Sequence, residues 1–209
     1  MAITLDGGIA LITGAASGIG KQTGFALAQA SVEGVIVADL DYSGAESVPE
    51  SKTWATHFNF CVTVILADVS DEAVVNNMVD VAVKESGGID HSIMSVYGDH
   101  TMAVNARGTM LVLGAVSATM AKQEPLIYQC ARHGGSRSRG HSSIVVVSSV
   151  NGTMVAPGML SYAASKLAVL GIAKTAVNLV APFYTETSML EASLKRHPEL
   201  GLLSKQLLH

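Results

Sequence analysis

The chain has 209 residues, which is enough for one domain with a sizeable core and too few for two. Hydrophobic residues make up 49% of it and charged residues 14%, a balance typical of an α/β domain whose parallel strands are buried on both faces. The formal net charge of −4 leaves no basic surplus to neutralise phosphates, so the composition argues against a nucleic-acid partner.

The cysteines and the first residues indicate a reducing, intracellular compartment. Cys61 and Cys130 are not spaced as a CxxC pair, so we expect free thiols. The first six residues contain neither a basic region nor a long apolar stretch, so no signal peptide is expected. The apolar segment 167–184 contains a lysine and a proline, which favours a core helix and a strand over a membrane span. The sequence therefore predicts a cytoplasmic protein without a membrane partner.

Apolar runs and amphipathic stretches alternate along the chain. The predicted strands are residues 9–13, 34–38, 63–67, 89–96, 143–148 and 176–181. The predicted helices are residues 20–30, 71–84, 100–122 and 161–173. A polar stretch over residues 41–56 separates the second strand from the third. Strands that alternate with helices imply parallel βαβ units, so we predict a single domain over residues 1–209 with a Rossmann-type, doubly wound α/β sheet.

Residues 131–141 break this pattern, because they contain three arginines and two histidines among glycines and serines. Such a segment can contact a phosphate or a nucleic acid. A solvated surface loop is the favoured interpretation, since glycine and serine dominate and no aromatic residue is interleaved.

The first predicted strand leads directly into a glycine motif, Thr13-Gly-Ala-Ala-Ser-Gly-Ile-Gly20, and a helix follows. Glycines at these points permit a tight turn and let backbone N–H groups approach a pyrophosphate, which the helix N-terminus also favours. A plain strand-to-helix turn is the alternative, but the flanking strand and helix favour dinucleotide binding. The residues predicted to contact the cofactor through this motif are Gly14, Ser17, Gly18, Ile19 and Gly20.

Acidic residues end the second and third predicted strands. Asp39 can accept hydrogen bonds from both hydroxyls of an adenine ribose and would repel a 2′-phosphate, so NAD is predicted in preference to NADP. Asp39 can equally be a simple turn residue. Asp68, followed by Val69, can hydrogen-bond the adenine amino group, or it can cap the helix that begins near Asp71.

A serine, a tyrosine and a lysine are the predicted catalytic residues. Ser149 follows the fifth strand, and Tyr162 and Lys166 are spaced to share one face of a helix. A neighbouring ammonium lowers the pKa of a phenol, which could make Tyr162 a general base near neutral pH. The alternative is an amphipathic tyrosine beside a lysine whose ammonium reaches solvent.

Four separated motifs together resemble the short-chain dehydrogenase/reductase family. They are residues 13–20, Val104-Asn105-Ala-Arg-Gly108, Ser149 and Tyr162-Ala-Ala-Ser-Lys166, in the family's order. The resemblance covers about residues 5–190 and implies one Rossmann domain that transfers a hydride between NAD(P) and an alcohol or carbonyl carbon. Residues 148–159 and 192–200 are similar to family members of fungal secondary-metabolite pathways.

The resemblance also implies a role for each matching residue. Tyr162 would be the general acid/base, Lys166 its activator and a ribose ligand, and Ser149 would orient the substrate oxygen. Asn105 would hold a water that relays protons through Lys166, and Thr187 would contact the nicotinamide carboxamide. The helices at 100–122 and 161–175 would form the contact of a homo-oligomer.

The sequence departs from the family pattern at three places. The Asn-Asn-Ala-Gly segment and a following helix are replaced by a short run from 90 to 105, in which Gly98 could stand for the motif glycine. Residues 174–182 leave little room between helix and strand, so either the helix ends near residue 173 or the sixth strand is lost. The family's last strand is expected to be missing. A catalytically impaired, cofactor-binding relative that acts as a partner subunit, or a non-functional truncated form, is therefore the alternative function.

Overall fold

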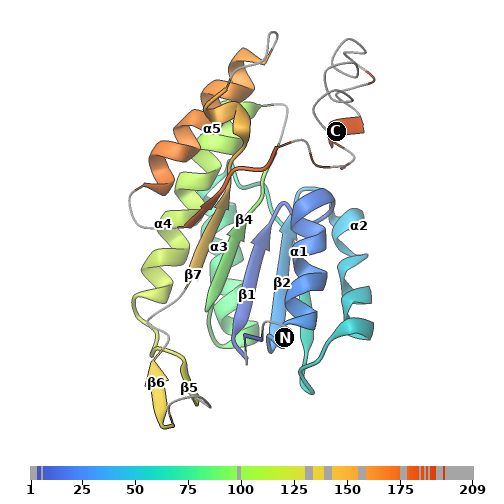
Figure 1. The fold of residues 1–209 in the computed structure, drawn as a ribbon, viewed down its shortest axis with the longest axis vertical. Helices are drawn as coiled ribbons and strands as arrows, with labels where there is room; N and C mark the ends of the chain where they lie inside the picture. The colour runs from blue at the N-terminus through green and yellow to red at the C-terminus, as the bar shows by residue number, and fades with distance from the viewer. Residues whose placement is uncertain are drawn as a thin grey trace.

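A computed structural model describes residues 4–5, 7–97, 100–129, 134–138, 143–154, 159–174, 178–183, 185, 187, 189–191 and 195. Its main feature is a six-stranded, all-parallel sheet in the order β3-β2-β1-β4-β7-β8, with helices on both faces (Figure 1). The strands are β1 (Ile9–Thr13), β2 (Gly34–Asp39), β3 (Cys61–Leu66), β4 (His91–Met94), β7 (Ser143–Val147) and β8 (Asn178–Val180). The predicted Rossmann-type fold is confirmed, and every predicted strand has its counterpart.

The helices connect these strands. They are α1 (Gly18–Gln29), α2 (Tyr42–Ala45), α3 (Glu72–Ser86), α4 (Thr109–Met120) and α5 (Leu160–Ala173). Two 3₁₀ segments, η1 (Val48–Trp54) and η3 (Val150–Gly152), and one π-helical segment, η2 (Met102–Gly108), complete the set. The α2 and η1 helices occupy the stretch predicted only as polar. The predicted helix 100–122 is continuous but consists of η2 followed by α4.

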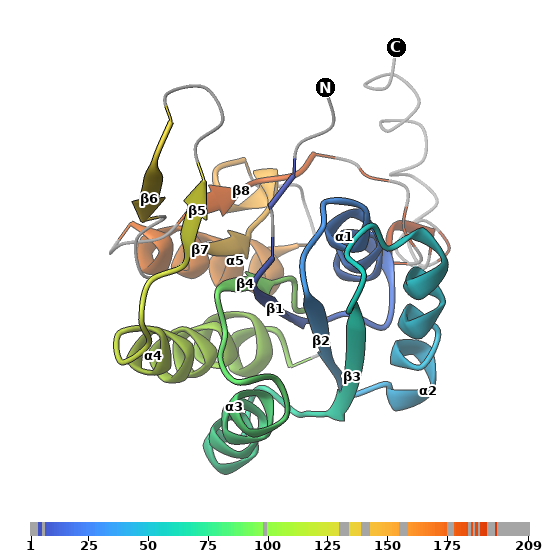
Figure 2. The same cartoon turned by 90° about the horizontal axis from the view of Figure 1, so that it is seen from below.

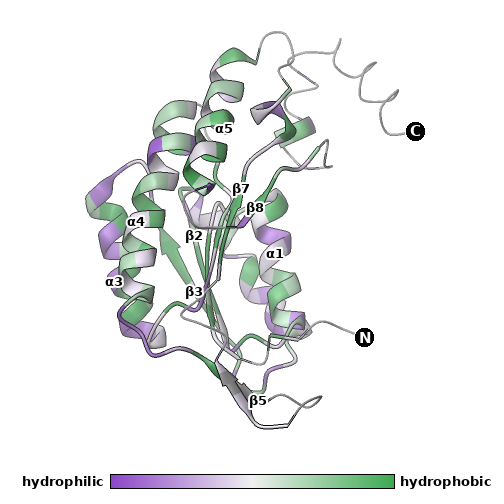
Figure 3. Cartoon of the chain, turned by 60° about the vertical axis from the view of Figure 1, so that its left-hand side comes forward, coloured by the Kyte–Doolittle hydropathy of each residue, from purple (hydrophilic) through white to green (hydrophobic). Residues whose placement is uncertain are grey.

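Two apolar layers hold the helices against the sheet. Side chains of α3, α4 and α5 pack on one face, where Leu11 and Ile36 point toward them. The α1 side has its own cluster, in which Ile12 and Val37 point the other way. This alternation follows from the two-residue period of a strand. Figure 2 shows the helices on the two faces of the sheet. Figure 3 shows the hydrophobic colouring of strands that lie between the helices.

The order of the strands reverses beside β1, because β1 pairs with β2 on one side and with β4 on the other. Parallel sheets bind ligands at such a switch point, just beyond the carboxyl ends of the strands. The fold therefore places its binding region where the β1–α1 turn meets the segment after β4.

The short run after β4 does not interrupt the sheet. β4 pairs with β7 in parallel register, Ser92 opposite Ile144, and η2 with α4 supplies the crossover between them. Gly98 lies outside the described residues. At the second departure, α5 ends at Ala173 and β8 begins at Asn178, so the helix ends early and the sixth strand is retained. The described part of the chain has no strand after β8.

The predicted surface loop at 131–141 is wrong at residues 136–138. These residues form β6 (Ser136–Ser138), which pairs in antiparallel register with β5 (Ile127–Gln129). The pairing partner lies outside the segment itself, so its composition could not reveal the strand. Cys130 and most of the remaining loop lie outside the described residues. No described helix is both long and apolar enough to cross a membrane.

Candidate active site

A cleft of about 250 Å³ lies beyond the carboxyl ends of β1, β4 and β7. One wall is the glycine turn before α1, and the opposite wall is α5 with the segment after β7. The predicted site residues that line this cleft are Gly14, Ser17, Gly18, Ile19, Asp39, Ser149, Tyr162, Lys166 and Thr187. The predicted residues that do not line it are Gly20, Asp68, Val69 and Asn105.

The glycine turn depends on close backbone packing. Gly14 has a positive φ of 72°, and a Cβ there would lie 2.0 Å from the carbonyl oxygen of Ser95. A Cβ on Gly20 would lie 2.1 Å from the carbonyl oxygen of Gly14. Gly14 therefore lets the segment after β4 rest on the turn, and Gly20 lets α1 begin directly behind it.

The first turn of α1 faces this cleft without a side-chain cap. Ser17 precedes the helix in an extended conformation and makes no capping hydrogen bond. Backbone N–H groups at a helix N-terminus without such a cap can receive an anion. Thr187 lies against this turn, because its Cγ2 would be 3.3 Å from a Cβ on Gly18. Its hydroxyl oxygen accepts a hydrogen bond from the Leu190 N–H at 3.3 Å.

Asp39 ends β2 and has the contacts of a turn residue. One carboxylate oxygen accepts the Ala16 N–H at 2.9 Å, and the other accepts the Asp41 N–H at 3.0 Å. The carboxylate thus stabilises two turns. Each oxygen keeps a further acceptor position, and the side chain lines the cleft, so the group can still accept hydrogen bonds from a ligand.

Asp68 does not cap α3. Its Oδ1 accepts hydrogen bonds from the hydroxyl and the N–H of Ser70, which hold the pKa of Asp68 below its usual value. Asp71 is the capping residue, because its carboxylate accepts the N–H groups of Ala73 and Val74. The capping alternative is therefore wrong for Asp68. Val69, next in the chain, is buried.

Tyr162 and Lys166 lie one turn apart on α5, as their spacing predicts. The Lys166 Nζ is 5.8 Å from the centroid of the Tyr162 ring and donates to the carbonyl oxygens of Val147 at 3.1 Å and Val96 at 3.3 Å. Only 4% of Lys166 is exposed, so its ammonium does not reach solvent. The alternative of a solvent-directed lysine is wrong.

The pKa of Tyr162 is raised rather than lowered. Burial raises the pKa of Tyr162, a hydrogen bond with Ser149 opposes this rise, and the neighbouring Tyr97 adds to it. Burial also lowers the pKa of Lys166 to about 8. The spacing of Tyr162 and Lys166 indicates only the neighbouring charge, whereas removal from water is the largest influence on the pKa of both groups.

The two consecutive serines after β7 have different surroundings. The Ser148 hydroxyl is buried and donates to the carbonyl oxygen of Lys166 at 3.0 Å, which joins β7 to α5. The Ser149 hydroxyl accepts the Asn151 N–H at 3.2 Å, and Ser149 lines the cleft together with Tyr162. Gly152 permits this arrangement, because a Cβ there would lie 2.9 Å from the Lys166 carbonyl oxygen.

Asn105 lies behind the cleft, in the π-helical segment η2. Its side chain is fully buried, and its Nδ2 donates to the Ser165 hydroxyl at 3.0 Å. Ser165 in turn donates to the Tyr162 carbonyl oxygen at 2.7 Å. The Oδ1 of Asn105 has no partner among the described residues. Asn105 therefore contacts α5 through Ser165, which lies inside the Tyr162–Lys166 motif but was not singled out from the sequence.

Further residues line the cleft without having been predicted, among them Tyr97, Asn151, Met159 and Phe183. Tyr97 follows β4 at the carboxyl edge of the sheet, so its position relative to a predicted strand was an available signal. The other three are brought in by loop geometry, which their local sequence does not encode.

We expect the buried Lys166 to affect stability as a function of pH. Its folded-state pKa of about 8 lies below that of an unfolded lysine, so between about pH 8 and about pH 10 the unfolded chain binds the extra proton. The free energy of unfolding of the wild type, relative to Lys166→Met, should therefore rise with pH in this window. Urea denaturation across the window measures it. Lys84→Met, which changes an exposed lysine on α3, corrects for the loss of one charge. A difference independent of pH would contradict the expectation.

The fold and the cleft define a Rossmann-type α/β protein with a glycine cradle facing a half-buried tyrosine and a buried lysine. The family model described as short chain dehydrogenase matches residues 8–197. The chain belongs to the short-chain dehydrogenase family. The resemblance stated from the motifs is thus confirmed, and the protein is an oxidoreductase of a family that binds NAD(P).

Curated relatives and solved structures agree with this assignment. Short-chain dehydrogenase srdC of Neurospora crassa is 35% identical over 221 residues, covering 93% of this chain and 80% of the relative. Short-chain dehydrogenase anuF of Penicillium roqueforti is 32% identical, covering 96% of this chain and 81% of the relative. The crystal structure of levodione reductase superimposes with a TM-score of 0.75 at 26% identity, covering 94% of this chain and 79% of the other.

Proposed function

We propose that this protein transfers a hydride between a nicotinamide dinucleotide and a secondary alcohol or ketone, with Tyr162 as the general acid/base. The observation that supports this most directly is that Tyr162, Lys166 and Ser149 line one cleft together with the glycine turn. A bound nicotinamide would supply or accept the hydride. The fungal relatives support a place among fungal short-chain dehydrogenases, and a role in secondary metabolism is part of the proposal.

Each catalytic side chain has a step that its position permits. Ser149 would hold the substrate oxygen beside the phenol. In reduction Tyr162 gives its proton to the carbonyl oxygen, and in oxidation it takes the proton of the alcohol. The Lys166 ammonium, held by two backbone carbonyls, would stabilise the phenolate that results. The unpartnered Oδ1 of Asn105 is a buried acceptor that could hold the water of a proton relay through Lys166.

The cleft suits a dinucleotide at its other end. Glycines at 14 and 18 leave room at the turn, and the N-terminus of α1 can receive a pyrophosphate. In this proposal Asp39 accepts hydrogen bonds from the adenine ribose, and Asp68 with Val69 lies toward the adenine. Thr187, beside Gly18, would contact the carboxamide of the nicotinamide.

We expect the wild type to bind NADH more tightly than NADPH because Asp39 repels a 2′-phosphate. Asp39→Asn keeps an acceptor oxygen but removes the charge, so the preference should fall by about tenfold, mainly through a gain in NADPH affinity. Calorimetric titration with both cofactors measures it. Asp80→Asn, on the exposed face of α3, is the control. An unchanged ratio in Asp39→Asn would contradict the assignment of Asp39.

Turnover is tested by following the absorbance of the reduced nicotinamide with neutral ketones and secondary alcohols. We expect turnover of at least one of these ketones or alcohols, and we expect that turnover to depend on Tyr162. Cofactor binding without turnover of any of these substrates would instead favour a catalytically impaired relative that acts as a partner subunit.

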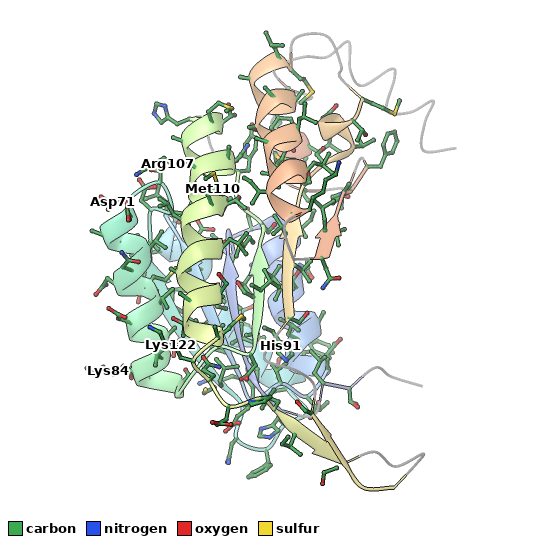
Figure 4. The ribbon with its side chains drawn as sticks, turned by 90° about the vertical axis from the view of Figure 1, so that its left-hand side faces the viewer. Asp71, Lys84, His91, Arg107, Met110 and Lys122 are labelled. Carbon is green, nitrogen blue, oxygen red and sulfur yellow. The ribbon has the colours of Figure 1, made fainter. Side chains whose placement is uncertain are left out.

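We further propose that α4 and α5, within residues 100–122 and 161–175, form a homo-oligomer contact. Both helices carry large apolar side chains that are exposed in the single chain: Met110 on α4 (Figure 4), and Leu160 and Leu167 on α5. Sedimentation velocity should detect an oligomer that dissociates in the double variant Met110→Glu, Leu167→Glu. Asn77→Glu on α3 should leave the assembly intact, and a wild-type monomer would contradict the proposal.

A further inference from the structure

Tyr97 occupies a position in the cleft that the catalytic mechanism does not use. It follows β4 by three residues and lines the cleft beside Tyr162. The centroids of the two rings are 5.8 Å apart and their planes meet at 69°, an edge-to-face contact. Yet 46% of Tyr97 remains exposed, so much of its surface is available to a ligand bound next to the catalytic phenol.

The rest of this end of the cleft is mostly apolar. Val150, Met159, Phe183 and Met189 contribute to its lining, and Phe183 is 44% exposed. The polar residues of the same lining include Ser149, Asn151 and Thr185, and the Asn151 Nδ2 is directed at the Met159 sulfur at 3.9 Å.

Charge is scarce on the described lining. It contains two ionisable side chains with charge at neutral pH, Asp39 at the cofactor end and Lys166. The Lys166 ammonium is already bound to two carbonyl oxygens. A substrate carboxylate or phosphate near Tyr162 would therefore lose its water without gaining a positive partner from the described lining, which is costly.

From these surroundings we propose that Tyr97 determines substrate specificity, by packing against an uncharged aromatic ring attached to the carbonyl or carbinol carbon of the substrate. The inference rests on the proposed function, because it places the reacting carbon beside Tyr162. The side chains of Tyr97 and Phe183, with the apolar residues around them, would contact a flat ring more favourably than an aliphatic group of equal size.

The test compares acetophenone with cyclohexyl methyl ketone, which has a saturated ring of equal carbon number. In wild type kcat/KM should be about three- to tenfold higher for acetophenone. Tyr97→Phe should keep this preference, and Tyr97→Ala should abolish it by lowering kcat/KM for acetophenone alone. NADH affinity, measured by calorimetry, should change by less than about twofold in both variants.

The same pair of ketones is also titrated against the protein with oxidised cofactor, with which a ketone does not react. Tighter binding of acetophenone, lost in Tyr97→Ala, is expected whether or not the protein turns over. Equal effects of Tyr97→Ala on both ketones, or a loss of NADH affinity in that variant, would overturn the inference. Tyr162-dependent turnover without an aromatic preference would contradict this inference but not the proposed function. An aromatic binding preference with no turnover of either ketone would instead count against the proposed function.

Discussion

Replacing Tyr162 by phenylalanine should lower turnover by about a thousandfold while leaving NADH affinity within about twofold of the wild type. The substitution removes only the phenolic oxygen of Tyr162, a residue that lines the cleft with Ser149, and this oxygen is the group proposed to exchange a proton with the substrate. The ring remains to pack edge-on against Tyr97 and beneath the Lys166 ammonium. Steady-state rates with a ketone, together with a calorimetric titration of cofactor, separate loss of chemistry from loss of binding.

Tyr42→Phe is the matched control, because it makes the same chemical change at an exposed tyrosine in α2. Its turnover should equal that of the wild type. The thermal midpoint of Tyr162→Phe should stay close to that of the wild type, since no apolar contact is lost. Turnover that survived in Tyr162→Phe would remove the general acid/base from the proposed mechanism.

Replacing Gly14 by alanine should abolish measurable cofactor binding and lower the free energy of unfolding by at least about 2 kcal/mol. Two causes add. The backbone has a positive φ of 72°, which disfavours any side chain, and the new Cβ would lie 2.0 Å from the Ser95 carbonyl oxygen. Backbone atoms cannot move aside as a flexible side chain can, so the turn or the end of β4 must shift. Urea denaturation and calorimetric titration with NADH measure the two effects.

Gly87→Ala separates the two causes. Gly87 has a positive φ of 82° at the C-terminal end of α3, but a Cβ there would meet nothing within 4 Å. The backbone cost alone should lower the free energy of unfolding by about 1 kcal/mol and leave cofactor binding unchanged. If Gly14→Ala were no more harmful than Gly87→Ala, close packing of the turn against Ser95 would not matter.

Most of the fold could be predicted from local patterns of apolar residues in the sequence. Buried parallel strands appear as continuous apolar runs, so β1, β2 and β7 could be found within a residue of their ends. The boundary after α5 could not, because both a longer helix and a sixth strand suit the apolar residues there. Pairing of β8 with β7 decides it, and that partner lies about thirty residues away in the chain.

The sequence by itself determined the glycine turn and the tyrosine–lysine pair that meet at the cleft. Glycine spacing specifies the turn before α1, and a separation of four residues places Tyr162 and Lys166 on one helix face, both of which are properties of the local chain. Only the tertiary structure decided their chemistry. Burial between β7, the segment after β4 and α5 raises the pKa of Tyr162 and lowers that of Lys166. It also separates the two serines, with Ser148 bound to the backbone of α5 and Ser149 facing the phenol. Solvation and long-range contacts depend on the whole fold, and for that reason no local motif contains them.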